Sequence, residues 1–209
     1  INETLVIKGP GVTDSTYSDK LQSFKTEVNR ITGVQNMSAS SNVPGNEIFW
    51  TRGIQRLSGN TELGLVVYNV GIDYDYLPSF NIDMLAGRNL SKDINDEDKI
   101  IMNRSLAEAL EFTDYEASIG EKVRLGGDTL EIVAIIEDYH QMSLKADVQP
   151  IAFRLSTSTS YFYFKIDSEN YRDVLDGIEA QWAAFFPGNP FDYYFLDEFF
   201  NRQYDSDRR

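Results

Sequence analysis

The sequence predicts an α+β protein in which two β-α-β units enclose a long, mostly β insertion. A short β-branched run, an amphipathic helical pattern and a second apolar run follow one another at both ends of the chain. Between them, glycine-punctuated strands of ordinary length fill roughly residues 42–158. The simplest packing gives the outer units one shared sheet with both helices on one face. We therefore expect one discontinuous domain, 1–41 plus 159–209, and one inserted domain, 42–158.

The first β-α-β unit occupies the start of the chain. A strand is predicted at Thr4–Lys8 and a second at Val34–Ser41. A helix is predicted between them, from about residue 17 to 31, and Gly33 is expected to be the glycine that ends it. Its apolar residues recur at spacings of three and four, which places them on one face: Leu21, Phe24, Val28 and Ile31.

The closing segment repeats this order. Tyr161–Ile166 is strongly strand-forming, and Ser168 is expected to cap a helix that runs to about Phe186. A strand at Phe191–Leu196 and a short helix over residues 197–204 are predicted to follow.

The middle of the chain has its own pattern of strands and turns. Strands are predicted at Leu63–Val70, Lys99–Asn103 and Glu131–Ile136, and the last of these is expected to be buried. Short helices are predicted to end near Phe80 and to span residues 104–111. Residues 86–89 are expected to form a turn with a positive φ at Gly87, and 122–125 to form a hairpin with the strand at 131.

Composition excludes several classes of function. The 209 residues carry a net charge of −14, which argues against nucleic acid and against anionic lipid as partners. The absence of cysteine excludes a disulfide framework, a thiolate nucleophile and a zinc–thiolate site. No run approaches the ~20 apolar residues that cross a bilayer. No cofactor and no metal site are predicted.

The single histidine, His140, lies just beyond the predicted buried strand, between Asp138 and Ser143. A catalytic triad needs the imidazole between hydroxyl and carboxylate, with backbone donors for the oxyanion, and close sequence neighbours rarely achieve this. The chain also has no Gly-x-Ser-x-Gly elbow. We therefore interpret these residues as a structural turn, and predict that the chain is not an enzyme.

Two further patterns have a structural and a functional interpretation. Residues 91–98 are the most acidic stretch, but an EF-hand loop counted from Asp93 would have Asp98 and Arg104 where glycine and glutamate are needed, so a solvated loop is the better interpretation. The 13 Phe and 12 Tyr could form a sugar-binding platform, yet most fall at strand or helix spacing, which favours core packing.

Four segments of the middle, in this order and spacing, resemble the extracytoplasmic domain of bacterial MacB/FtsX-type ABC transporter permeases. They are the segment from Asp73 and Tyr76 to Gly87-Arg88-Asn89, the strand ending in Asn103, the Gly120 segment, and Asp138-Tyr-His140 followed by Ser143. The closing stretch 189–198 is similar to the strand that precedes the next membrane helix in that family. Ala134 and Arg104 depart from the pattern, where a glycine and an acidic residue are common.

The resemblance implies an architecture and a function. The outer β-α-β units would form a porter-like subdomain and the insertion a sabre-like one, with both chain ends continuing into transmembrane helices. The domain would lie on the extracytoplasmic, periplasmic side of the cytoplasmic membrane and contain no catalytic residue. Its partners would be those helices, a cytoplasmic ATP-binding subunit, a periplasmic adaptor or substrate protein, and a second permease copy.

Hinges between the two subdomains are expected near residues 42–45 and 155–160. Two alternatives stay open. The chain could be a free-standing module that binds carbohydrate or peptide, or an enzyme that uses Asp138 and His140.

Overall fold

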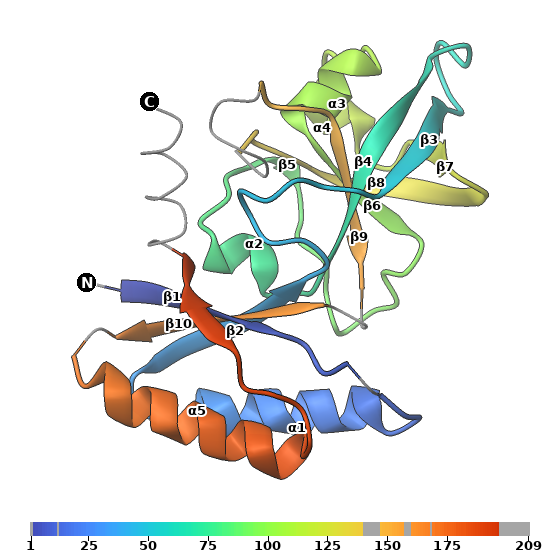
Figure 1. Ribbon diagram of the computed structural model, residues 1–209. Coiled ribbons are helices and arrows are strands. Elements are labelled where there is room, and N and C mark those ends of the chain that lie inside the picture. The colour runs from blue at the N-terminus through green and yellow to red at the C-terminus, as the bar shows by residue number, and fades with distance from the viewer. Residues whose placement is uncertain (1, 12, 140–146, 157–159, 168, 197–209) are drawn as a thin grey trace. The chain divides into compact units, whose positions relative to one another are not determined.

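The chain forms two compact units, residues 1–41 with 157–209 and residues 42–156. The computed structural model describes residues 2–11, 13–139, 147–156, 160–167 and 169–196 (Figure 1). The elements of unit 1 are β1 (Asn2–Lys8), α1 (Tyr17–Asn29), β2 (Val34–Ser40), β10 (Tyr161–Asp167), α5 (Tyr171–Phe185) and β11 (Tyr193–Phe195). The elements of unit 2 are β3 (Thr51–Arg56), β4 (Gly64–Ile72), α2 (Tyr76–Ser79), β5 (Met84–Gly87), β6 (Lys99–Asn103), α3 (Arg104–Ala109), α4 (Tyr115–Ser118), β7 (Lys122–Leu125), β8 (Asp128–Ile136) and β9 (Ile151–Leu155).

Unit 1 is a sheet with the strand order β11-β1-β10-β2, in which neighbouring strands are antiparallel. The two strands of each β-α-β unit are therefore separated by a strand of the other unit, which is the split β-α-β arrangement. Insertion of unit 2 between β2 and β10 leaves this sheet intact, because β2 and β10 pair directly from Ser40 and Tyr161 onward.

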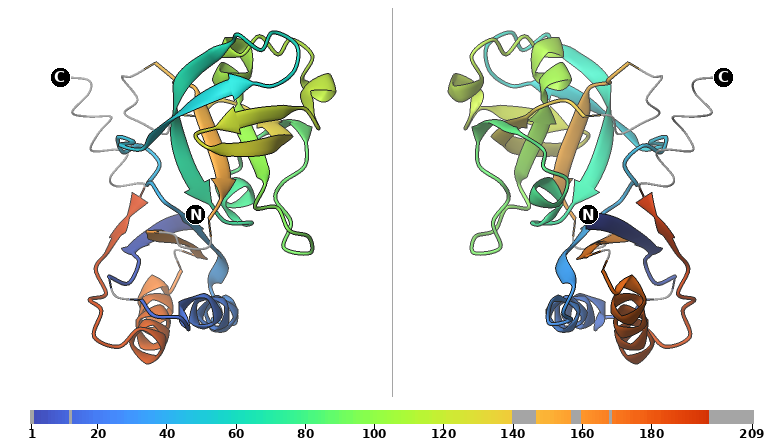
Figure 2. Two further views of the ribbon diagram at one scale, coloured as in Figure 1. Left: turned by 90° about the vertical axis from the view of Figure 1, so that its right-hand side faces the viewer. Right: turned by 90° about the vertical axis from the view of Figure 1, so that its left-hand side faces the viewer.

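Both helices of unit 1 pack on one face of its sheet, and Figure 2 shows them side by side. Phe24 of α1 lies at the centre of the core, with its ring centroid 5.9 Å from that of Trp182 and 6.2 Å from that of Phe164. The alternation of β10 explains this core, because Phe162, Phe164 and Ile166 project to the helix side. The predicted α+β class and its paired β-α-β units are confirmed.

Two details of unit 1 differ from the sequence prediction. Gly33 does not end α1, since the helix stops at Asn29 and Arg30 is its C-cap. Gly33 instead has φ +99°, and a Cβ there would lie 2.5 Å from the Val174 Cγ2, so this glycine makes room for α5. The N-cap of α5 is Asn170, which has a left-handed backbone conformation, and not the predicted Ser168. Ser168 itself and the helix predicted over 197–204 lie outside the described residues.

The strands of unit 2 close into a ring in the order β4-β3-β7-β8-β6-β9, and β9 returns to pair with β4. The pairs β4–β9 and β6–β8 are parallel and the others are antiparallel. β5 extends the ring by pairing with the last part of β8.

The inside of this ring is a core of aliphatic side chains. β8 has buried residues at nearly every position from Leu130 to Ile136, because it is covered on both faces, as its apolar run predicted. α3 adds Leu106 and Ala107, and its C-cap adds Leu110, each fully buried in the same cluster.

β3, β9 and α4 are absent from the sequence prediction, and the predicted turn at 86–89 contains the end of a strand. The other predicted strands and short helices of the insertion are confirmed to within about three residues. No helix within the described ranges is long and apolar enough to span a bilayer.

Candidate functional site

The motif residues of β6 and β8 meet at one place in unit 2. These strands are parallel, and Asn103 pairs with Ile136 in the register, so Asn103 and Asp138 emerge from neighbouring strands at the same edge. Residues 140–146, which follow Tyr139 in the sequence, are not among those that the structure describes. His140 and Ser143 belong to that segment and lie outside the described residues.

Asn103 is a buried junction between α3, β9 and the residue before Pro150. Its Oδ1 accepts from the backbone N–H groups of Leu106 and Ile151, each at 3.0 Å. Its Nδ2 donates to the Gln149 carbonyl at 2.8 Å. The side chain is only 1% exposed. Asn103 therefore caps α3 and fixes the start of β9 with a single amide group.

Asp138 is bound to the first turn of α3. Its two carboxylate oxygens accept from the backbone N–H and the hydroxyl of Ser105, at 2.9 and 2.7 Å. Arg104, the departure from the family pattern, forms an ion pair with Glu137 at 2.9 Å. The carboxylate at a helix N-terminus is electrostatically favourable there, so Asp138 serves to attach the end of β8 to α3.

Tyr76 and Tyr139 connect α2 to the same edge. Their hydroxyl oxygens are 3.0 Å apart, and the Tyr139 ring stacks on Phe153 of β9 with centroids separated by 6.0 Å. Tyr76 is fully buried and packs against Phe80. Asp73 precedes α2 and accepts from the Asp75 N–H at 3.1 Å, which is an Asx-type turn.

Gly87 occupies a position that only glycine can fill. Its φ is +81°, and a Cβ there would lie 2.0 Å from the Val133 carbonyl oxygen. Because β5 runs so close to β8, the following Arg88 N–H can donate to that same carbonyl at 3.0 Å. The positive φ was predicted, but Gly87 closes a paired strand and does not lie in a free turn.

Arg88 forms the most complete ion pair of unit 2. Its two terminal nitrogens donate to the two oxygens of Asp96, each at 2.9 Å, and the Ser91 N–H donates to Asp96 at 2.7 Å. The hydrogen bond from Arg88 lowers the pKa of Asp96, and the same bond raises the pKa of Arg88. The pair thus contributes stability at neutral pH that is lost as the pH falls through the lowered pKa of Asp96.

The expectation of a solvated acidic loop is therefore wrong at Asp96, which is fully buried. It remains correct for its neighbours Asp93, Asn95, Glu97 and Asp98, which are exposed. Among the residues that the structure describes, no group of three or more His, Asp or Glu side chains could ligate a metal.

Gly120 makes the turn before β7. It has φ +92° and donates its N–H to the Ile132 carbonyl at 2.9 Å. This hydrogen bond ties the end of α4 to β8, so Gly120 is also a structural position.

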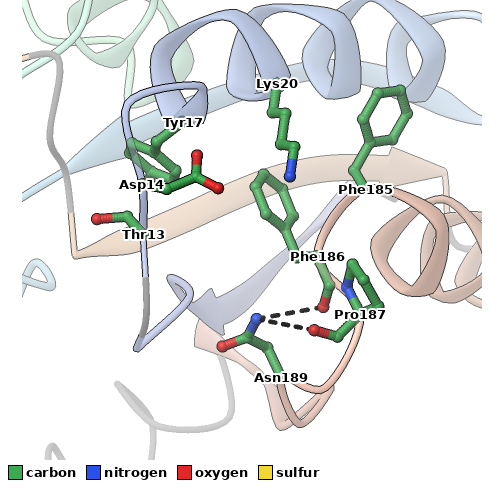
Figure 3. A pocket seen from close by; sticks show the side chains of 8 residues that line it. All are labelled: Thr13, Asp14, Tyr17, Lys20, Phe185, Phe186, Pro187 and Asn189. Carbon is green, nitrogen blue, oxygen red and sulfur yellow. Dashed lines mark hydrogen bonds between the residues drawn. The ribbon is translucent and has the colours of Figure 1, made fainter.

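A pocket of about 200 Å³ lies in unit 1, between the start of α1 and the end of α5 (Figure 3). Rings of Tyr17 and Phe186 form its wall, with centroids 6.0 Å apart, and burial raises the pKa of Tyr17. Asn189 is committed to the α5 terminus, because it donates to the Phe186 and Pro187 carbonyls and accepts from Gly11.

Two charged side chains reach the same pocket. Asp14 accepts from Thr16, and the hydroxyl bond from Thr16 lowers the pKa of this exposed carboxylate. The Lys20 side chain also lines the pocket, and its positive charge lowers the pKa of Asp14 further. The two opposite charges give this shallow site no preference for one class of ligand.

For three of these side-chain contacts, the sequence analysis identified one of the two residues but not its partner. Ser105, Asp96 and Tyr139 complete the contacts of Asp138, Arg88 and Tyr76, and nothing in their local sequence indicated those partners. Asn103 and Asp138 each lie at or just beyond the end of a predicted strand, but their proximity depends on the parallel pairing of β6 with β8, which was not predicted. The arrangement provides buried anchors at strand ends, and no nucleophile–base pair appears among the motif residues described.

The chain belongs to the MacB-like periplasmic core domain family, whose profile matches residues 3–180.

Solved structures agree in fold. The periplasmic region of MacB from Actinobacillus actinomycetemcomitans superposes with a TM-score of 0.65 at 12% identity, covering 96% of this chain and 92% of that one. The extracellular domain of the noncanonic ABC-type transporter YknZ from Gram-positive bacteria superposes with a TM-score of 0.61 at 13% identity, covering 93% of this chain and 99% of that one. No curated protein matched the sequence.

Proposed function

We propose that this chain is the extracytoplasmic domain of an ABC transporter permease and transmits motion from cytoplasmic ATP hydrolysis to a substrate or partner protein outside the membrane. The observation that carries the proposal is membership of the MacB-like periplasmic core domain family over residues 3–180. In this proposal unit 1 is the porter-like part and unit 2 the sabre-like part. The domain itself is not an enzyme.

The pairing of β1 with β11 supports a mechanical role. Leu5 lies opposite Phe195 in this antiparallel pair, so the start of β1 and the end of β11 are at the same end of the two strands. Segments that precede β1 and follow β11 would therefore join unit 1 side by side. A displacement of two flanking membrane helices would then act on adjacent strands. It would reach unit 2 through the two connections, at residues 41/42 and 156/157, which act as hinges.

The partners follow from this role. They are the flanking helices of the same permease, a cytoplasmic ATP-binding subunit or domain, a second permease copy, and a periplasmic adaptor or substrate protein. The domain would be located on the periplasmic side of the cytoplasmic membrane. The anchors at Asn103, Asp138 and Arg88 would keep unit 2 rigid, so that motion is transmitted and not absorbed.

A distance measurement in the full permease tests the transmission. Spin labels are attached at Asp19→Cys in unit 1 and Asp93→Cys in unit 2, both exposed positions in a chain that has no cysteine of its own. We expect the distance distribution between them, measured by double electron–electron resonance, to differ between the nucleotide-free and vanadate-trapped states.

The matched control pairs Asp93→Cys with Glu116→Cys, both within unit 2 and both exposed. This distribution should stay unchanged between the two states. An unchanged distance between the units during ATP hydrolysis would contradict the proposed transmission.

A further inference from the structure

Three glycines lie close together on the outer face of the ring, at β3, β4 and the turn that follows β7. Ile54 of β3 is buried inside the ring, so its neighbour Gly53 faces outward. The register places Gly53 opposite Val66, and Gly64 opposite Gln55. The Gly126 N–H donates to the Gly53 carbonyl at 2.8 Å, which extends the same bare surface to the β7–β8 turn.

The backbone does not require glycine at position 53. Its φ lies outside the left-handed region, and a Cβ added there would meet no atom within 4 Å. Glycine in the interior of a strand weakens that strand, and often marks a place where a ligand or another backbone approaches closely. Gly53 contrasts in this respect with Gly87, whose surroundings exclude any side chain.

A groove of about 360 Å³ lies over these glycines. Gln55, Leu65 and Arg124 line its sides, and Val66 stands beside it with 70% of its surface exposed. A large aliphatic side chain exposed in the interior of a paired strand adds an apolar contact to the glycine floor.

The charge at the groove is opposite to that of the chain. The chain has a net charge of −14, yet the charged side chain that lines the groove is the cation Arg124. Arg124 makes no ion pair within the described residues. A carboxylate would satisfy Arg124 with charge-assisted hydrogen bonds.

We propose that this groove binds an extended segment of a partner protein in which an aromatic side chain is adjacent to a carboxylate. The ring would cover Gly53 beside Val66, as aromatic side chains do over strand glycines, and the carboxylate would pair with Arg124. The segment docks across the face of the sheet, because both edges of β3 are already paired with β4 and β7.

The test uses capped tripeptides and amide chemical shifts of the 209-residue chain. The probe is N-acetylated, C-amidated Glu-Trp-Glu, and the comparison peptides are Glu-Ala-Glu and Lys-Trp-Lys with the same caps. We expect Glu-Trp-Glu at millimolar concentration to shift the amide signals of Gly53, Gly64 and Gly126, and to bind at least about tenfold more tightly than either comparison peptide.

Variants locate the binding. Gly53→Leu fills the groove and Arg124→Glu reverses its charge, and each should weaken Glu-Trp-Glu by at least about tenfold. Gly11→Leu is the matched control, because Gly11 is also exposed with open space around its Cβ position but belongs to unit 1. It should leave the affinity unchanged.

Three results would overturn the proposal. They are the absence of shifts at the three glycines, equal binding of Lys-Trp-Lys, or binding that survives Gly53→Leu. Shifts caused by laurate or maltose, without any caused by Glu-Trp-Glu, would also overturn it and assign the groove to lipid or sugar. None of these results bears on the motion between the units, so the two proposals can fail separately.

Discussion

Replacing Gly87 with alanine should destabilise unit 2 more than any other single methyl addition that the fold suggests. The added Cβ would lie 2.0 Å from the Val133 carbonyl oxygen and 2.9 Å from the Ala134 Cα, both of them backbone atoms. The positive φ costs an alanine about 1–2 kcal/mol by itself, and separating β5 from β8 adds to this. We expect a total loss of at least about 3 kcal/mol, measured by urea unfolding followed by circular dichroism.

Gly127→Ala is the control for this substitution. Gly127 lies in the β7–β8 turn, its φ is not positive, and no atom is within 4 Å of its Cβ position. Gly127→Ala should change the free energy of unfolding by less than about 0.5 kcal/mol. Comparable unfolding midpoints for the two variants would show that the approach of β5 to β8 is not as close as the structure has it.

Replacing Asn103 with alanine should be the second most damaging change. It removes the acceptor for the Leu106 and Ile151 N–H groups and the donor to the Gln149 carbonyl, all around a side chain that is 1% exposed. An unsatisfied buried polar group costs about 1–3 kcal/mol, and a lost N-cap about 1 kcal/mol. We expect a loss of about 2–4 kcal/mol, with faster amide hydrogen exchange at Leu106 and Ile151.

Asn95→Ala provides the comparison, because Asn95 is exposed and accepts a single hydrogen bond, from the Glu97 N–H at 3.0 Å. It should cost less than about 1 kcal/mol. If Asn103→Ala unfolds at the same urea concentration as Asn95→Ala, with unchanged exchange at Leu106 and Ile151, then Asn103 is not the junction described above.

The parts of the fold that could be predicted are those in which one local pattern and burial agree. β8 has a continuous apolar run because it is covered on both faces, and α1 shows the spacing of a helix with one buried face. The pairing of outer units into one sheet followed from their repeated order.

β3 could not be recognised, since its sequence Thr-Arg-Gly-Ile-Gln-Arg offers only Ile54 to the core and depends on β4 and β7 for its strand conformation. β9 was missed although Ile151–Leu155, with the sequence Ile-Ala-Phe-Arg-Leu, is apolar except for Arg154 and follows directly after Pro150. The site shows the same division. Asn103 and Asp138 were each placed at the end of a predicted strand, whereas no local pattern indicated that Asp96 is buried in an ion pair with Arg88.

The most direct test of the central claim is the side of the membrane on which this domain lies. Asp93→Cys is introduced into the full permease, with any cysteine elsewhere in it replaced, and intact cells are treated with a membrane-impermeant maleimide. Asp93 is exposed, whereas Ala152 is fully buried, so Ala152→Cys reports background and unfolding. We predict labelling of Asp93→Cys in intact cells and of Ala152→Cys only after denaturation. Labelling of Asp93→Cys only after lysis would contradict an extracytoplasmic domain.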